Sequence, residues 1–412
     1  MTSPSLFTPL QLARGTTIKN RFFKSAMSEQ LADWQNNPLP KLARLYGTWA
    51  AGGTGLLVTG NVMIDRNALG EPKQVVLDER SELQGFRNWA EAATRHGTEC
   101  WMQLNHPGKQ IPSFLSKQPV APSAVPLGGG LEKAFNPPRA LTEDEILTII
   151  GKFATAARLA KATGFTGVQI HGAHGYLVSQ FLSPHHNRRK DRWGGSLENR
   201  MRFVLEVYAA IRAAVGEDFP VGIKLNSADF QRGGFEEGEA IEVIRALSAQ
   251  GIDLIEISGG NYESPAMMGK AKKSTVEREA YFLDFAEQVR QHTDVPLVVT
   301  GGFRSGRAMQ QALESGATDM IGLARPLTLY PDLPKRIEAN PDFRAEFTRP
   351  STGMRDLDRM AMLDITWYEC QIERIADGKQ PDPKLSAWSA VIHTFGRLGV
   401  HAFRKRRAKA KA

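Results

Sequence analysis

The chain has 412 residues, of which 42% are hydrophobic and 23% charged, so it can bury a large core. No stretch approaches the roughly 20 apolar residues of a membrane span, and the start, MTSPSLFTPL, lacks the charged region of a secretory signal, so we expect a cytoplasmic protein. Two cysteines, Cys100 and Cys370, are too few for a disulfide framework or for a cysteine-ligated zinc or iron–sulfur site.

The formal net charge of +8 comes mostly from the end of the chain. Residues 397–412 contain seven basic residues and no acidic one, which leaves the rest of the chain nearly neutral. A high overall pI that belongs to a tail does not indicate a nucleic-acid-binding surface or an acidic substrate.

In chain order, short β-rich runs alternate with helical patterns, which predicts repeated βα units around a parallel sheet. We expect eight strands, and eight such units close a (β/α)8 TIM barrel of the α/β class. The expected strands are 21–27, 54–60, 99–104, 166–171, 219–226, 252–258, 295–300 and 318–323. We assign residues 1–340 to the barrel and 341–412 to a C-terminal helical extension with a basic tail.

Two features are expected between the third and fourth strands. Thr142 and Glu145 have the spacing of a capping box, and apolar residues follow at helical intervals, so a helix should begin here and pack on the barrel. Residues 107–140 are rich in proline and glycine and too long for an ordinary connection. We expect this segment to cap the mouth of the active site.

The fourth strand ends in His171, His174 and Tyr176, directly after an apolar run. Polar residues at the carboxyl end of a barrel strand are typical of a catalytic site. Two imidazoles and a phenol can hold a carbonyl oxygen and supply a proton, although such a tyrosine could also merely line a pocket.

A metal site formed with His185 and His186 is the alternative interpretation of these histidines. We expect none, because no carboxylate or cysteine accompanies the pair and the turn at 183–184 should carry the later histidines away.

Two more strand ends carry informative residues. Gly301, Gly302 and Phe303 follow the seventh strand, and Ala324 and Arg325 follow the eighth, where barrels commonly bind phosphate; ordinary glycine turns are the alternative.

Lys224 brings a charge into the fifth strand, where a buried lysine needs an anionic partner. Two alternatives remain open for it. The ammonium could reach solvent at the barrel mouth, or it could be a Schiff-base lysine.

Several of these motifs together resemble the Old Yellow Enzyme family of FMN-dependent NADH:flavin oxidoreductases and ene-reductases. The resemblance rests on IHGAHGYLVSQFLSPHHNRRKDRWGGSLENR, on KNR at 19–21, on QLNH at 103–106, on GGF at 301–303 and on GLAR at 322–325, and it spans about 320 residues in the order of the family. It implies non-covalent FMN and NADH or NADPH as reductant.

The resemblance also implies roles for particular residues. The backbone of Ala26 and Met27 would lie against the flavin ring, the hydroxyl of Ser28 would bond its O4 edge, and Gly60 would leave room for the ring. The Gln103 side chain would bond the pyrimidine edge. Lys224 stands where many members carry arginine. Its ammonium would place a single positive charge beside N1 and O2, without the paired donors of a guanidinium. The phosphate would be held by Gly301, Gly302, Phe303, Ala324 and Arg325.

For the reaction, the resemblance implies that His171 and His174 hold the substrate carbonyl. Hydride would pass from flavin N5 to the β-carbon, and Tyr176 would protonate the α-carbon from the opposite face. The substrates would be α,β-unsaturated carbonyl or nitro compounds. The charged segment 187–200 is expected to be structural, with Ser196 capping the next helix.

Other functions stay open at this point. A related FMN enzyme of the NADH oxidase type, or one that oxidises amines, is the first alternative. A flavin-dependent tRNA-modifying relative is disfavoured because neither cysteine lies on an active-site loop, and we expect no nucleic-acid partner. A flavin-free scaffold would be colourless.

The tail carries an apolar stripe from about residue 387, followed by RKRRAKAKA. Such a stripe most often docks on its own barrel or on a second subunit, so a homo-oligomer is possible. Association with an anionic membrane is an alternative.

Overall fold

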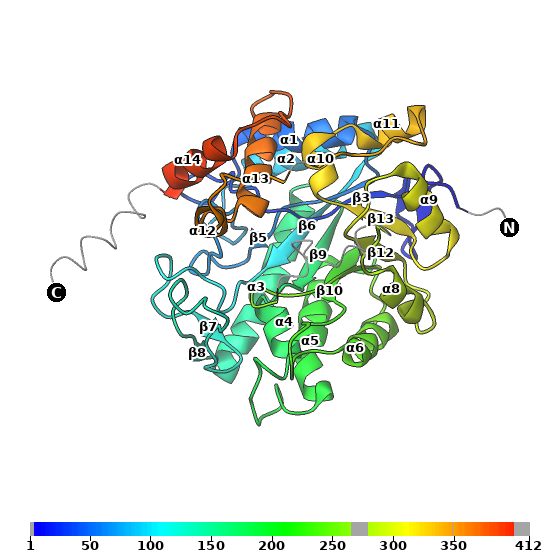
Figure 1. The fold of residues 1–412 in the computed structure, drawn as a ribbon. Helices are drawn as coiled ribbons and strands as arrows, with labels where there is room; N and C mark the ends of the chain where they lie inside the picture. Colours follow the sequence, from blue (N-terminus) through cyan, green and yellow to red (C-terminus); the bar gives the residue numbers. More distant parts are fainter. Residues whose placement is uncertain (1–3, 265–278, 348, 399–412) are drawn as a thin grey trace.

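The computed structural model describes residues 4–264, 279–347 and 349–398. Within them, parallel strands close into a barrel at the centre of the molecule, in the order β4-β3-β13-β12-β11-β10-β9-β6 with β6 paired to β4 (Figure 1). The strands are β3 (Phe22–Lys24), β4 (Leu56–Val58), β6 (Glu99–Asn105), β9 (Gly167–Gly172), β10 (Val221–Asn226), β11 (Leu254–Ser258), β12 (Leu297–Thr300) and β13 (Met320–Leu323). Each falls on one of the eight expected strands, and the predicted TIM barrel is confirmed.

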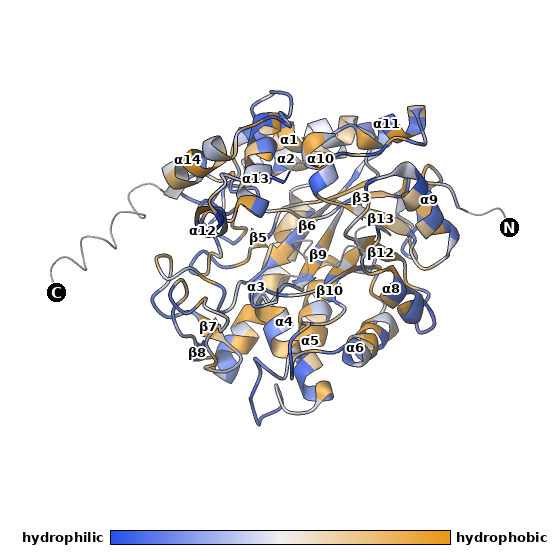
Figure 2. Cartoon of the chain, viewed as in Figure 1, coloured by the Kyte–Doolittle hydropathy of each residue, from blue (hydrophilic) through white to orange (hydrophobic). Residues whose placement is uncertain are grey.

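Helices surround this barrel, with polar outer faces and apolar inner ones (Figure 2). They are α1 (Pro40–Ala51), α2 (Leu83–Thr94), the 3-10 turn η1 (Arg95–Gly97), α3 (Glu143–Ala162), α4 (Leu177–Leu182), α5 (Leu197–Val215), α6 (Glu237–Ala249), α8 (Leu283–Arg290), α9 (Gly306–Glu314), α10 (Arg325–Leu329) and α11 (Leu333–Ala339). The predicted capping box of Thr142 and Glu145 is present at the start of α3, and the Ser196 side chain caps α5.

The strands explain how polar groups reach the barrel interior. Alternate residues of a strand face opposite sides, so Ile223 and Leu225 of β10 pack outward against the helices while Lys224 between them faces inward. The lowest interior layer is apolar and includes Trp101, Leu254 and Val298. Above it the inward positions become polar, which places hydrogen-bonding groups towards the carboxyl ends of the strands.

Short strands add smaller features that the sequence pattern did not predict. β1 (Leu10–Gln11) and β2 (Thr17–Ile18) form an antiparallel hairpin whose apolar side chains pack with the lowest interior layer. β5 (Val62–Met63) pairs with β6, and β7 (Val120–Ala121) pairs with β8 (Arg139–Ala140) inside the segment 107–140.

Three helices follow the barrel: α12 (Arg355–Met360), α13 (Leu363–Ala376) and α14 (Ala387–Leu398). α13 is fixed to α1, because Lys41 Nζ lies 2.5 Å from Glu373 Oε1 and Arg44 donates to the carbonyl of Ala376.

α14 docks on α13 through part of the expected apolar stripe. Ala387, Ala390 and Val391 are buried with Trp367, whereas Trp388 and Ile392 are exposed. The basic cluster lies outside the described residues. No helix in the described part of the chain is both long and apolar enough to cross a bilayer.

Candidate functional site

The three side chains singled out at the end of β9 lie together. The ring centroid of His171 is 5.1 Å from that of His174 and 4.8 Å from that of Tyr176. His174 has a positive φ of 61°, which turns the chain sharply after the strand, and Tyr176 stands at the N-cap of α4. The short spacing therefore delivers two imidazoles and a phenol to one place.

Both imidazoles are electrically neutral at pH 7. Burial, together with the nearby positive charge of Lys224, holds the pKa of His171 and of His174 well below the ordinary value. The amide of Ala173 donates to Nδ1 of His171 at 3.3 Å, so the proton of this neutral ring is on Nε2. His174 Nε2 lies 2.8 Å from Ser258 Oγ.

The phenol of Tyr176 is protonated and hydrogen-bonded. Burial raises its pKa well above the ordinary value. Its oxygen lies 3.0 Å from the phenol oxygen of Tyr262, and it also forms a hydrogen bond with the Asn61 side chain. Tyr176 can therefore act as an acid at neutral pH.

A cavity of about 420 Å³ opens at the carboxyl ends of β3, β10, β12 and β13. Its walls include one of the two histidines and seven of the expected cofactor residues: His174, Ala26, Lys224, Gly301, Gly302, Phe303, Ala324 and Arg325. Side chains from the C-terminal extension also reach this cavity, namely Phe347, Arg349 and Tyr368.

Lys224 is buried and paired. Its Nζ lies 3.0 Å from Glu256 Oε1 on the neighbouring strand, and its side chain is 4% exposed. An ammonium reaching solvent at the barrel mouth, one of the alternatives for this residue, is therefore wrong. Glu256 also accepts hydrogen bonds from Gln169 and Thr300, so protein donors stabilise its buried carboxylate.

Two features of the barrel interior fit bound FMN. Gln103 donates to Gln169 at 2.7 Å, but its own Oε1 is buried without a hydrogen-bond partner. A buried amide oxygen of this kind needs a donor, and the N–H groups of a flavin pyrimidine ring supply one. Gly301 and Gly302 have φ values of 127° and 95°, which side-chain-bearing residues rarely adopt, and they leave the backbone of this loop open to the cavity.

Arg325, the expected phosphate anchor, is positioned by the extension. Its guanidinium lies 5.6 Å from the Tyr368 ring centroid and hydrogen-bonds the phenol. The backbone amides at the start of α9 already bind a carboxylate. The amides of Arg304 and Ser305 donate hydrogen bonds to Glu279. The phosphate would therefore share this helix end with a carboxylate, and Arg325 supplies positive charge.

Four expected cofactor residues, Met27, Ser28, Gly60 and Gln103, do not line the cavity in the described structure. The Ser28 hydroxyl donates to Glu71. At Gly60 an added Cβ would lie 2.6 Å from the carbonyl oxygen of Met27, so close backbone packing alone requires glycine here.

The later histidines form a different cluster. In the described residues, His185, His186 and Glu263 are the group of possible metal ligands, with ligand atoms within 4.8 Å of one another. The carboxylate that the local sequence lacked thus comes from a distant loop. Lys109 Nζ lies 2.9 Å from His186 Nδ1, and a positive ammonium at that distance opposes a bound cation.

Segment 187–200 is structural, as expected: Arg189 pairs with Asp191 and Arg200 with Glu239. Sequence reasoning missed Glu256, Ser258 and Tyr262. Glu256 and Ser258 occupy alternate positions of a strand that is otherwise apolar, which was a usable signal. Tyr262 follows the same strand end, where barrel sites are built.

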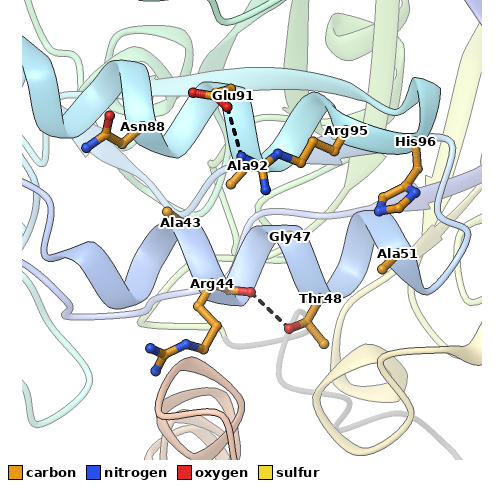
Figure 3. Close-up of a pocket in the computed structure, with 10 residues that line it drawn as sticks. All are labelled: Ala43, Arg44, Gly47, Thr48, Ala51, Asn88, Glu91, Ala92, Arg95 and His96. Carbon is orange, nitrogen blue, oxygen red and sulfur yellow. Dashed lines mark hydrogen bonds and ion pairs between the residues drawn. The ribbon is translucent and has the colours of Figure 1, made fainter.

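A second hollow, of about 700 Å³, lies on the outside of the barrel between α1 and α2 (Figure 3). Its lining comes from helix surfaces, where Glu91 and Arg95 pair with each other at 2.8 Å and Arg44 donates to the carbonyl of Ala376. It is remote from the strand ends that carry the polar residues, so we assign the site to the interior cavity.

Comparison with known proteins places these features among flavin enzymes. The model of the NADH:flavin oxidoreductase / NADH oxidase family matches residues 5–342. The NADH-dependent flavin oxidoreductase iliE of Hypocrea jecorina is 40% identical over 358 residues, covering 81% of this chain and 88% of that protein.

Two solved structures share the fold. An Old Yellow Enzyme homologue from Zymomonas mobilis has a TM-score of 0.70 at 28% identity, covering 83% of this chain and 94% of that one. 2-Naphthoyl-CoA reductase has a TM-score of 0.75 at 29% identity, covering 83% of this chain. The match extends over 53% of the reductase chain, so this chain spans about half of that protein.

Proposed function

Because the chain belongs to the NADH:flavin oxidoreductase / NADH oxidase family, with FMN as cofactor and NAD(P)H as reductant, we propose that it reduces the activated C=C bond of α,β-unsaturated carbonyl or nitro compounds. The observation that carries this proposal is the group of two neutral imidazoles and a protonated phenol beside the cofactor cavity. Bound FMN supplies the hydride.

In this proposal the imidazoles hold the substrate. His171 carries its proton on Nε2, and this N–H donates a hydrogen bond to the carbonyl or nitro oxygen. His174 adds a second donor after exchanging its contact with Ser258. A donor pair that faces the developing negative charge polarises the double bond and makes its β-carbon electrophilic.

Tyr176 completes the addition. Its buried phenol keeps its proton at neutral pH and gives that proton to the α-carbon. The cap segment and the loop after β11 cover the phenol: Phe135 of the cap lies 6.3 Å from the Tyr262 ring. This cover limits the access of water to the reacting carbon.

For the predicted cofactor residues, the proposal assigns the pyrimidine edge to Gln103, the N1 and O2 side to Lys224 and the phosphate to Gly302, Phe303 and Arg325. The unpartnered Oε1 of Gln103 and the lining of the cavity support these assignments. Ser28 is proposed to turn from Glu71 to the O4 edge.

The test is turnover of cyclohexenone, a maleimide and a nitroalkene with NADH and with NADPH. We expect a yellow protein that releases its flavin on mild denaturation, and His171→Ala and His174→Ala should each lower enone turnover by roughly 100-fold. Both variants should also bind phenolic ligands more weakly. Y208F, which removes a phenol from α5 on the outside of the barrel, is the control.

Two results would contradict the proposal. Enone turnover unchanged in either histidine variant would remove that residue from the site. NADH consumption that needs oxygen but no alkene, and that neither substitution affects, would instead favour an oxidase of the NADH oxidase type.

A further inference from the structure

We propose that Tyr262 is the proton-relay partner of Tyr176: it donates a hydrogen bond to the Tyr176 oxygen and replaces the proton that Tyr176 gives to the substrate. This inference rests on the proposed function, because it needs Tyr176 to be the acid. The contact that points to it is the distance of 3.0 Å between the two phenol oxygens.

Hydrogen bonds anchor the backbone around Tyr262. It lies in the loop after β11, where the amides of Glu263 and Ser264 both donate to the Asn261 side chain. The next residue is fixed as well, because the amide of Gly128 in the cap donates to Glu263 Oε1 at 2.5 Å. Both ends of the short segment around Tyr262 are therefore anchored, and its phenol faces Tyr176.

The partners of the Tyr176 oxygen determine where its own hydrogen points. Asn61 Oδ1 accepts from Gln74 Nε2 at 3.3 Å, so the amide nitrogen of Asn61 is the group that can donate to Tyr176. Either phenol can be the donor in their contact. In the proposed arrangement Tyr262 donates together with Asn61, and the two lone pairs of the Tyr176 oxygen are then occupied. The remaining O–H of Tyr176 is then free to point at a substrate carbon.

The proton balance follows directly. The Tyr176 O–H bond breaks as the bond from hydrogen to the substrate α-carbon forms. In the same step the Tyr262 O–H bond breaks and its proton passes to the Tyr176 oxygen. Tyr262, which is partly exposed, regains a proton from solvent before the next turnover. No free phenolate has to persist at Tyr176, whose burial disfavours a negative charge.

Burial and nearby carboxylates keep both phenols protonated at neutral pH. Glu71 raises the pKa of both phenols further, after burial, and Glu369 adds to this at Tyr262. Tyr262 is therefore protonated at neutral pH and available as a donor. The relay leaves the transient negative charge on Tyr262, which is partly exposed, and not on the buried Tyr176.

The test measures the two half-reactions separately by stopped flow, in wild type, Y262F, Y176F and the double variant, with Y208F as the matched control. We expect Y262F to lower the limiting rate of enone reduction by about 10-fold or more, with an unchanged apparent Kd for the enone and unchanged reduction of FMN by NADH. Because both phenols act in one step, the double variant should be no slower than Y176F alone.

Four outcomes would overturn the relay. Y262F could react within twofold of wild type, or it could slow the Y176F enzyme by the same factor as it slows wild type. If Y262F loses flavin or folds poorly, the test is made on the wild-type enzyme. The rate of enone reduction is then measured in mixtures of H₂O and D₂O. The N5–H of reduced FMN also exchanges with solvent, so the nitroalkene, whose hydride step needs no proton from Tyr176, measures that contribution alone. An enone dependence that needs only one further exchanging site rejects the relay. Y176F that leaves enone reduction unchanged shows instead that the acid assigned under the proposed function is wrong, and the relay falls with it.

Discussion

At the scale of single residues, Lys224 decides how much positive charge the barrel interior holds. The ammonium is paired with Glu256 at 3.0 Å, and both groups are almost fully buried. The interior therefore offers an ion pair, not an isolated cation, to the cofactor. Removing one partner of such a pair leaves an uncompensated buried charge.

This pairing gives a prediction for Lys224. Lys224→Met should lower the free energy of unfolding by about 3 to 5 kcal/mol and weaken FMN binding, because the buried Glu256 carboxyl group loses its cationic partner. Lys224→Arg should retain most of both. Urea unfolding and flavin fluorescence titration measure the two effects. A Met variant as stable as wild type would show that Gln169 and Thr300 alone compensate the carboxylate.

The neutral histidines predict a flat pH dependence. Their folded-state pKa values lie well below 6.5, so neither ring gains a proton between pH 6 and 8. Binding of a phenolic ligand should be constant across that range in wild type. A binding curve with a midpoint near 6.5 would mean that one ring is exposed to solvent and charges at that pH.

At the scale of elements, the sequence predicts the strands and helix caps that follow from local residue patterns. All eight barrel strands, the cap of α3 and the cap of α5 follow from local patterns. The pairing of Lys224 with Glu256 could not be predicted, because it depends on the register between two strands. The contact of Tyr176 with Tyr262 joins residues 86 positions apart through loops that carry no pattern.

The C-terminal helices predict two different truncation results. Deleting residues 387–412 removes α14 and exposes the apolar surface around Trp367, so we expect a melting temperature lower by several degrees with unchanged flavin content. Deleting residues 355–412 also removes Tyr368, which positions Arg325, so this protein should lose FMN as well.

Thermal melting and the ratio of flavin to protein absorbance check both truncations. If the shorter deletion keeps its melting temperature and its mass, α14 contributes nothing to stability, and sedimentation of the full-length chain with anionic vesicles would then favour the membrane reading of the tail. If the longer deletion keeps its flavin, the support from Tyr368 is not needed.

At the scale of the whole molecule, the site is assembled from both parts of the chain. The barrel supplies the strand ends, while Phe347, Arg349 and Tyr368 from beyond residue 340 close one side of the cavity. The boundary expected from sequence therefore passes through the neighbourhood of the cofactor. Composition could not show this, because the packing of α13 on α1 is a tertiary contact.

The buried histidines also predict how global stability depends on pH. Burial lowers the pKa of His106 to about 4 and that of His186 to about 2, and His171 and His174 shift in the same direction. In the unfolded chain each returns to about 6.5. The unfolded state therefore binds more protons below that pH, and stability that is fully present at pH 7.5 should fall as the pH decreases.

The window from pH 7 to 5 is the most informative one for the histidines, since most carboxylates stay ionised there. In the described residues, burial raises the pKa of four carboxyl groups, which act with the opposite sign: Glu29, Glu99, Asp229 and Asp253. We expect the free energy of unfolding to decrease steadily from pH 7 to 5 in urea titrations. His106→Asn keeps an acceptor for the Gly108 amide but cannot take up a proton, so it should flatten the slope. Equal slopes in the variant and wild type would mean that His106 charges in the folded protein as readily as in the unfolded chain.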